Sequence, residues 1–192
     1  MPLSTVYLGL GSNIDRHRHL CAGLDALAAI LTDMRCSPAF ESQAVGIKSG
    51  PFINFVVTGK TDLPLMELDR RLKFIEADNG RYAPDRKGLP LDIDVLMYDD
   101  LHGTYDGLVL PRAEILKNAF VLWPLALLAP ELVHPGAGKR MAQLWQEARI
   151  EQVLAPVAFE WRGLQLTPAW MGRGTPQALK TVMYLWAPAC RR

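Results

Sequence analysis

The chain has 192 residues, of which 49% are hydrophobic, so it suits one domain with at most an appendage and can bury a core, which excludes a disordered chain. Its 21 basic and 20 acidic residues give a net charge of +1, which argues against a protein that mainly binds nucleic acid. Three cysteines without a CxxC pair, and the lack of a secretory-signal pattern or an apolar run of about 18 residues, predict a cytoplasmic protein without a membrane span.

Strand-like and helix-like segments alternate along the first half of the chain. The predicted elements are, in chain order, a strand over 5–10, a helix over 17–31, strands over 34–42 and 52–60, a helix over 64–78 and a strand over 91–98. The order β-α-β-β-α-β is typical of a ferredoxin-like unit, an antiparallel sheet with helices on one face. We therefore predict an α+β fold.

The second half of the chain contains one more strongly apolar segment and then changes character. Residues 118–128 predict a third helix. Residues 150–192 carry three tryptophans and strand-like stretches at 158–166 and 180–187. We expect residues 1–149 to form the α+β domain and the remainder to form a β-rich C-terminal extension packed on it. Exposed tryptophans in that extension would favour an interface.

Asp92 and Asp94 form the clearest chemical signal. On the last predicted strand alternate side chains share a face, so Leu91, Ile93 and Val95 would enter the core while both carboxylates point the other way, roughly 7 Å apart. Two neighbouring carboxylates repel one another unless a cation lies between them, and Mg²⁺ shared with substrate phosphates is the obvious candidate. D-x-D is common, so the pair taken alone is equally consistent with two solvated aspartates.

Two other polar groups lie on or beside predicted strands. Gly11-Ser12-Asn13 stands at a strand-to-helix turn whose backbone amides could receive an anion, although an ordinary turn with a helix cap is the more frequent explanation. Asn54 lies in mid-strand near Phe52, and a carboxamide beside an aromatic face suits the edge of a heterocycle. Taken alone, an asparagine in such a position more often forms hydrogen bonds with nearby backbone N–H and C=O groups.

Glu76 and a basic loop precede the aspartate pair. Glu76 lies near the end of the second predicted helix and, taken alone, is a solvated residue. Arg81, Arg86 and Lys87 lie in the loop that leads to Asp92, where cations on a mobile segment could clamp phosphates over a metal site. A solvated loop explains the same charges.

These motifs follow one another in one order: GSN, F-x-N, E-x-x-x-G-R, L-D-I-D-V and F-V-L-W-P-L-x-x-L-A-P-E-L. In that order they resemble the 6-hydroxymethyl-7,8-dihydropterin pyrophosphokinase family, over residues 6–145. Members of that family transfer pyrophosphate from ATP to the hydroxymethyl group of a pterin in folate biosynthesis and release AMP. The resemblance implies a diphosphotransferase that uses two Mg²⁺ ions, with ATP as co-substrate.

The resemblance also implies roles for individual residues. Four residues would be catalytic, the two aspartates as metal ligands: Asp92, Asp94, Arg81 and Arg86. Six residues would bind the pterin: Ser42, Gln43, Val45, Phe52, Asn54 and Phe120. Five residues would bind the nucleotide: Lys73, Glu76, Lys87, Arg112 and Lys117. The expected partners are these small molecules, with no nucleic acid and no membrane, and the protein would be a monomer or a homodimer.

Some positions depart from the family pattern. Leu89 and Asn118 stand where arginines are expected, and Ala83 stands where a second loop arginine often lies. The enzyme could use another phosphate donor or a modified pterin, or the chain could be a paralogue with weak or no kinase activity. We favour a third explanation, because both aspartates are retained. In it, the missing charge comes from basic residues at shifted positions: Arg86, Lys87, Arg112 and Lys117.

Two further classes of function stay open. A protein that binds pterin or nucleotide without catalysis would show pterin binding but no ATP-dependent turnover. A ferredoxin-like interaction module, as in RNA-binding domains, fits less well, because the central strand lacks paired aromatic residues and the net charge is close to zero.

Overall fold

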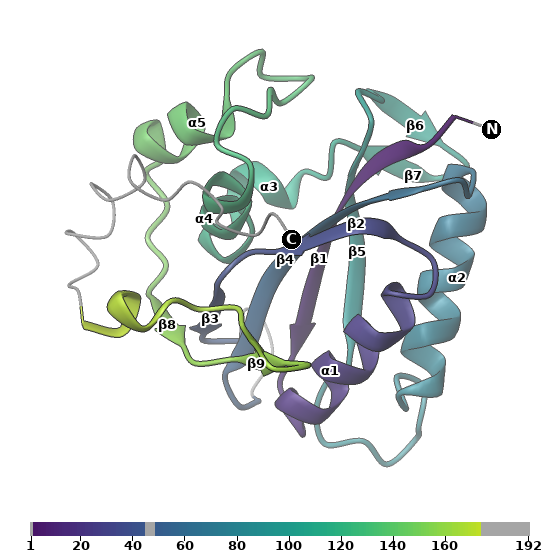
Figure 1. Cartoon of the computed structure of the whole chain (residues 1–192), viewed down its shortest axis with the longest axis vertical. Coiled ribbons are helices and arrows are strands. Elements are labelled where there is room, and N and C mark those ends of the chain that lie inside the picture. Colours follow the sequence, from purple (N-terminus) through teal and green to yellow (C-terminus); the bar gives the residue numbers. More distant parts are fainter. Residues whose placement is uncertain (1, 45–48, 174–192) are drawn as a thin grey trace.

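The computed structural model describes residues 2–44 and 49–173 and has a central antiparallel sheet between two groups of helices (Figure 1). None of the helices in these ranges is long and apolar enough to cross a membrane. The elements are β1 (Ser4–Ser12), α1 (Arg16–Leu27), β2 (Thr32–Cys36), β3 (Ala39–Ser42), β4 (Phe52–Thr61), α2 (Leu65–Asp78), β5 (Asp92–Tyr98), β6 (Gly103–Tyr105), β7 (Leu108–Leu110), α3 (Glu114–Lys117), α4 (Ala119–Leu128), α5 (Met141–Glu147), β8 (Leu154–Val157), β9 (Glu160–Trp161), β10 (Leu164–Gln165) and the 3₁₀ helix η1 (Ala169–Arg173).

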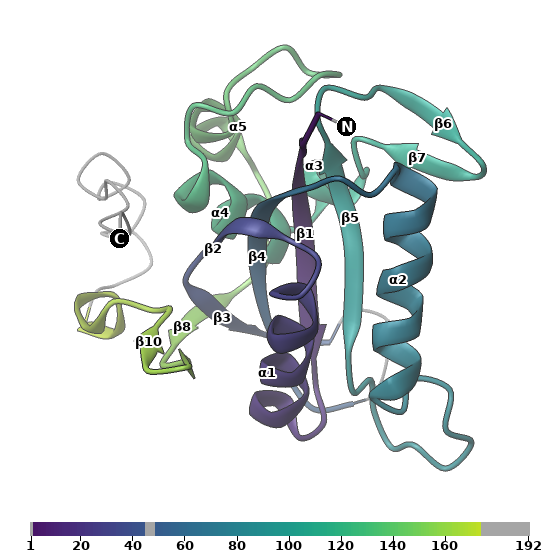
Figure 2. The ribbon, with the colours of Figure 1, turned by 45° about the vertical axis from the view of Figure 1, so that its right-hand side comes forward.

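The main sheet has six strands, in the order β5-β1-β4-β3-β8, with β2 also paired to β4. These pairings are all antiparallel. Figure 2 shows β1 running between β4 and β5, and β5 is an outer strand of the sheet. This is the strand order of a ferredoxin-like unit, so the predicted α+β fold is confirmed.

Ser37 and Pro38 divide the strand that was predicted over 34–42 into β2 and β3. Proline has no amide hydrogen to give to a sheet ladder, so pairing is interrupted there. Ser37 spans the interruption: its N–H donates to the carbonyl of Val56 at 2.8 Å, and its hydroxyl accepts the N–H of Val56 at 2.9 Å. β2 and β3 therefore pair with successive parts of the same strand, β4.

The two faces of the sheet carry separate apolar cores. α1 and α2 cover one face, where their leucines pack against side chains of β1, β4 and β5. α3, α4 and α5 form the other core, in which the rings of Trp123 and Trp145 stack with centroids 5.2 Å apart. The expectation of helices on one face therefore holds for α1 and α2. The predicted third helix, α4, is confirmed but packs on the opposite face, against β3 and β4.

The C-terminal extension begins as part of the main sheet. β8 pairs with β3 and places Leu154 in the core. The short β9–β10 hairpin then lies near α1 (Figure 1), where the indole of Trp161 donates to Asp25 at 3.0 Å. The stretch predicted as a strand over 158–166 thus contains two short strands joined by a turn. The stretch over 180–187 lies outside the described residues.

Candidate active site

Asp92 and Asp94 lie on the outer strand β5 and point to the sheet face opposite α1 and α2. The residue between them, Ile93, is buried in the α1–α2 core, so the strand alternates as the sequence predicted. Across the ladder, Gly11 of β1 stands opposite Asp92, and Gly9 stands opposite Asp94. Because glycine has no side chain, both positions leave open floor beside the carboxylates.

The row continues onto β4, where Asn54 stands opposite Gly11. Asn54 is buried, and its Nδ2 donates to the hydroxyl of Ser42 at 2.8 Å. A Cβ on Gly11 would lie 2.8 Å from Oδ1 of Asn54, so a larger residue would push the carboxamide aside. The sheet thus sets a carboxylate, an open floor and a carboxamide on three adjacent strands, whose outer two are about 10 Å apart.

A cavity of about 230 Å³ opens over this row, and we call it the sheet hollow. β1, β4 and β5 form its floor, and α3 and α4 form its remaining wall. It is acidic at one end and has amide groups and an aromatic ring at the other, and its lining includes Asn54, Asp92, Asp94, Asn118 and Phe120. Such a combination suits a flat polar heterocycle.

An arginine contacts each aspartate. Arg81, just after α2, donates to Oδ1 of Asp92 at 2.7 Å and to the carbonyl of Leu91 at 3.1 Å. Arg112, just after β7, donates to Oδ1 of Asp94 at 2.9 Å. Burial would lower the pKa of Arg81, but its contact with Asp92 raises it above the usual value. Both aspartates therefore lie within a network of fixed positive charge.

A second cavity, of about 430 Å³, lies beside the same aspartates, and we call it the edge hollow. Asp92 and Asp94 line both hollows and form the boundary between them. The other charged residues that line the edge hollow are Asp69, Lys73, Glu76, Arg81, Asp106 and Arg112. Its three cations are each paired with one of its carboxylates, so an anionic ligand here would also need a metal ion to offset the carboxylate charge.

Glu76 is not the solvated residue that its position in the sequence suggested. Its side chain is buried, and Oε1 accepts the backbone N–H of Ile93 at 2.8 Å. β5 is an outer strand, so this N–H has no strand partner, and the last turn of α2 brings the carboxylate to it. Burial raises the pKa of Glu76 to about 7, although the N–H of Ile93 and the charge of Arg81 oppose the shift.

The aspartate pair has the charge and the donor atoms that suit a divalent cation. Burial, and next the charge of Asp92, raise the pKa of Asp94 to about 6, while Arg112 opposes the shift. A cation bound by both carboxylates would relieve their repulsion. Within residues 2–44 and 49–173, no cluster of three or more His, Cys, Asp or Glu is placed to hold a metal. The hard carboxylate oxygens of the pair fit Mg²⁺, which takes few protein ligands and completes its shell with phosphate oxygens and water.

Comparison with known proteins bears directly on this arrangement. Residues 7–130 match the family described as 7,8-dihydro-6-hydroxymethylpterin-pyrophosphokinase, HPPK. The chain belongs to this family.

Two relatives, each named 2-amino-4-hydroxy-6-hydroxymethyldihydropteridine pyrophosphokinase, match over most of their length. The Aquifex aeolicus protein is 35% identical over 136 residues, which cover 69% of this chain and 85% of that protein. The Synechocystis protein is 36% identical over 151 residues, which cover 76% of this chain and 74% of that protein. The Plasmodium falciparum HPPK-DHPS structure shares the fold, with a TM-score of 0.62 at 14% identity over 76% of this chain and 43% of that one.

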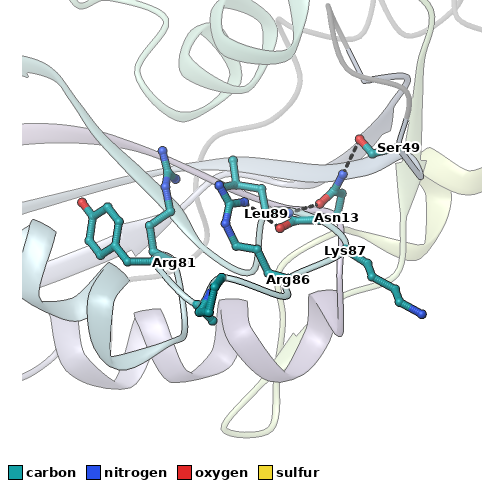
Figure 3. A pocket seen from close by; sticks show the side chains of 10 residues that line it. Asn13, Ser49, Arg81, Arg86, Lys87 and Leu89 are labelled. Atoms are coloured by element: carbon teal, nitrogen blue, oxygen red, sulfur yellow. Dashed lines mark hydrogen bonds between the residues drawn. The ribbon is translucent and has the colours of Figure 1, made fainter.

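The loop between α2 and β5 holds two of the positions, Ala83 and Leu89, at which this HPPK-family chain departs from the expected pattern. The loop lines a third cavity, of about 710 Å³, which we call the loop hollow. Figure 3 shows Arg81 and Lys87 at opposite sides of this hollow. Arg86 donates to the carbonyl of Gly88, and neither Arg86 nor Lys87 lines the sheet hollow or the edge hollow. Of the basic residues proposed to replace the missing arginines, the structure brings Arg112 to the aspartates.

Asn13 joins the two loops that border the loop hollow (Figure 3). Its Nδ2 donates to the hydroxyl of Ser49 at 2.7 Å, and its Oδ1 accepts the N–H of Leu89 at 2.5 Å. The interpretation of the GSN motif as a helix cap is wrong: the N-cap residue of α1 is Asp15, and no side chain caps that helix. The motif instead supplies a floor glycine, Gly11, and a tie between two loops.

The remaining residues predicted to bind substrate differ in burial and in their position relative to the three hollows. Ser42 is buried and accepts the amide described above. Phe52 is half-buried on β4, and the side chain of Gln43 is exposed. Val45 lies outside the described residues. Lys117 is exposed on α3 and lines none of the three hollows.

Sequence reasoning missed Gly9 and assigned Gly11 to a turn, although both lie inside β1. A signal was present, because glycines two residues apart on a strand share one face and mark a place where a ligand can approach the backbone. The burial of Glu76 had no comparable signal, since it depends on how the end of α2 meets the edge of β5.

Proposed function

We propose that this protein transfers pyrophosphate from ATP to the hydroxymethyl group of 6-hydroxymethyl-7,8-dihydropterin, with release of AMP, as a step in folate biosynthesis. The shared name of its relatives describes an enzyme of this kind. One observation carries the proposal: the row from Asp92 through Gly11 to Asn54 joins a phosphate-handling end to a heterocycle-binding end. A sheet holds such a row rigidly, which suits a reaction that depends on alignment.

In this proposal the pterin occupies the sheet hollow. The carboxamide of Asn54 presents a donor and an acceptor in one plane, which matches the hydrogen-bonding edge of a pterin. Its bond to Ser42 uses one amide hydrogen and fixes the plane of the group. Phe120 offers an aromatic face to the ring, since it lines the same hollow. Phe52 lies on β4 two residues before Asn54, and Gln43 follows the last residue of β3, Ser42.

The phosphates of ATP occupy the edge hollow, with the nucleotide-side cations around them. Asp92 and Asp94 would hold two magnesium ions, because their carboxylates line both hollows. Magnesium, when bound there, neutralises charge on the phosphates during transfer. Lys73, Arg81 and Arg112 contribute fixed positive charge from α2, the loop after it and the segment after β7. Glu76 acts on this site indirectly, by fixing the edge of β5.

The chain's contribution to the reaction is positioning and charge. The hydroxyl oxygen of the pterin attacks the β-phosphorus of ATP in line, the bond from that phosphorus to the oxygen of AMP breaks, and the hydroxyl proton is released. Asn54 and Phe120 orient the attacking group, while Arg81 and Arg112 stabilise negative charge on the phosphates. No covalent intermediate with the protein is required. Arg86 and Lys87 are exposed on the loop and line neither the sheet hollow nor the edge hollow, so in this arrangement they contribute little to the transfer.

The direct test is an assay of AMP release by the purified protein with Mg²⁺, ATP and 6-hydroxymethyl-7,8-dihydropterin. We expect one AMP per molecule of pyrophosphorylated pterin, and no AMP when the pterin is left out or when EDTA removes the metal. GTP in place of ATP serves as a parallel reaction that tests the phosphate donor. A folded protein that releases no AMP from ATP would overturn the proposal, and release of GMP from GTP in the parallel reaction would then identify a different phosphate donor.

A further inference from the structure

The C-terminal extension reaches the wall of the sheet hollow through Gln152. Its Oε1 accepts the backbone N–H of Ala119 at 2.7 Å, and its Nε2 donates to Oδ1 of Asn118 at 3.2 Å. Both partners lie 33 or 34 residues earlier in the chain, at the start of α4. Gln152 is therefore a long-range contact to the helix that carries Phe120.

This contact replaces an ordinary helix cap. The first N–H groups of a helix have no partner within the helix, and a side chain at the N-cap position usually accepts one of them. Asn118 occupies the N-cap position of α4, yet its own side chain makes no cap hydrogen bond. Gln152 accepts the N–H of Ala119 in its place and at the same time holds the carboxamide of Asn118. Asn118 and Phe120, on either side of Ala119, both line the sheet hollow.

The same short segment also reaches β3, the strand that pairs with the floor strand β4. Two residues after Gln152, Leu154 opens β8, is buried and pairs with Ser42 of β3. Ser42 in turn accepts the amide of Asn54, the polar residue of the hollow's floor. Val153 between them is 82% exposed, whereas Gln152 is half-buried and Leu154 is buried, an alternation that is typical of an extended segment. The segment from Gln152 to Leu154 therefore links the start of α4 to β3, beside the floor strand β4.

We propose that Gln152 is a positioning residue for the pterin: it holds the start of α4, with Asn118 and Phe120, at a set distance from Asn54. The proposal rests on the proposed function and adds to it that the segment from Gln152 to Leu154, which does not line the sheet hollow, holds the residues that do. It assigns Gln152 an effect on the pterin and none on the nucleotide, because the edge hollow contains no residue of α4 or β8.

The test compares Gln152→Met, which keeps the length of the side chain but loses both hydrogen bonds, with the wild type. We expect KM for the pterin to rise about tenfold, because the start of α4 loses the two part-buried hydrogen bonds that hold it, while KM for ATP stays within about twofold. Gln152→Glu should return KM for the pterin to within about threefold of the wild type. A carboxylate still accepts the N–H of Ala119, and the carboxamide of Asn118 can turn its Nδ2 toward it. Gln165→Met is the matched control, since Gln165 bonds to Glu160 on the exposed hairpin.

The results separate a positioning role from a structural one. If both KM values rise together, or if only the melting temperature falls while KM for the pterin is unchanged, the proposal is overturned. Wild-type turnover decides the proposed function independently. Should the wild type release no AMP, calorimetry with 6-hydroxymethyl-7,8-dihydropterin gives the same comparison: a dissociation constant about tenfold weaker in Gln152→Met supports the inference, and an unchanged one overturns it.

Discussion

The two regions that flank the aspartate pair are held in different ways. On one side, the floor of the sheet hollow is set by strand register, which places Asn54 and Gly11 in one row with Asp92. On the other side, the loop that carries Arg86 and Lys87 is exposed, and Arg86 bonds to the loop's own backbone. Residues fixed by the sheet keep their relation to the aspartate pair through many contacts, whereas residues of an exposed loop do not.

This difference matches the departures from the family at Leu89 and Ala83, although Asn118, a third departure, lines the sheet hollow. Leu89 and Ala83, which stand at expected arginine positions, both lie on the loop, and the residues of the sheet row match the expected motif. The positive charge near the aspartates comes instead from Arg81, anchored to the carbonyl of Leu91, and from Arg112 beyond β7. We infer that this chain keeps its chemistry in the anchored part of the site and tolerates change in the loop.

The largest expected effect concerns the aspartate pair, the acidic end of the sheet hollow. Asp94→Asn should lower kcat by about a thousandfold or more, because the metal loses a charged ligand worth several kcal/mol in the transition state. Binding of the pterin alone, measured by calorimetry, should stay within about threefold of the wild type. Asp33→Asn, which alters an exposed aspartate paired with Lys60, is the control. If Asp94→Asn weakened pterin binding as much as it lowered kcat, the sheet hollow and the edge hollow would not bind the pterin and the phosphates separately.

A smaller effect should distinguish the anchored arginine from the loop arginine. Arg81→Ala should reduce kcat about a hundredfold, since a charge-assisted donor beside the phosphates is lost. Arg86→Ala should change kcat by less than about threefold, because exposed charges contribute little. Steady-state kinetics of both variants, with melting temperatures to confirm folding, measure the contrast. Similar losses in the two variants would mean that the loop closes on the substrate and that the comparison between sheet and loop fails.

Glu76 should impose a pH dependence on stability. Its pKa is about 7 in the folded protein against 4.5 for an ordinary glutamate, so between these pH values the folded protein holds a proton that the unfolded chain has released. Stability from this group is therefore present below about pH 4.5 and is lost as pH rises to about 7. Glu76→Gln keeps an acceptor for the N–H of Ile93 and removes the titration. Urea unfolding at pH 5 and pH 8 should show the wild type losing on the order of 2 kcal/mol more than the variant. Parallel pH profiles for the two proteins would contradict this assignment.

The smallest of these effects concerns the open floor. Gly11→Ala adds a Cβ at 2.8 Å from Oδ1 of Asn54, so the carboxamide must move. We expect KM for the pterin to rise about tenfold, the cost of a small steric shift, with little change in KM for ATP. Gly172→Ala, whose Cβ would meet nothing within 4 Å, is the matched control. An unchanged KM for the pterin would indicate that the floor next to Asn54 is not where the pterin binds.

Much of the anchored region could be predicted from the sequence. The periodicity of apolar residues gave the order of strands and helices, and the alternation around Asp92 and Asp94 gave the face on which they lie. The split at Ser37 and Pro38 is a local effect that a proline already suggests. Burial of Glu76 could not be predicted, because it needs the position of α2 relative to the edge of β5.

The C-terminal extension was the least predictable region. β8 is short, contains Pro156 and shows no clear alternation, so only the available edge of β3 makes it a strand. The contact of Gln152 with Asn118 joins segments that are distant in sequence, and neither residue carries a motif. Such contacts depend on tertiary packing, which local patterns do not encode.

The central claim is that the row from Asp92 to Asn54 places both substrates. A crystal structure with Mg²⁺, a non-hydrolysable ATP analogue and 6-hydroxymethyl-7,8-dihydropterin tests it most directly. We predict that carboxylate oxygens of Asp92 and Asp94 ligate the metal, that the pterin lies in the sheet hollow against Asn54 and Phe120, and that the phosphates fill the edge hollow. A metal bound elsewhere, or a pterin outside the sheet hollow, would contradict the account.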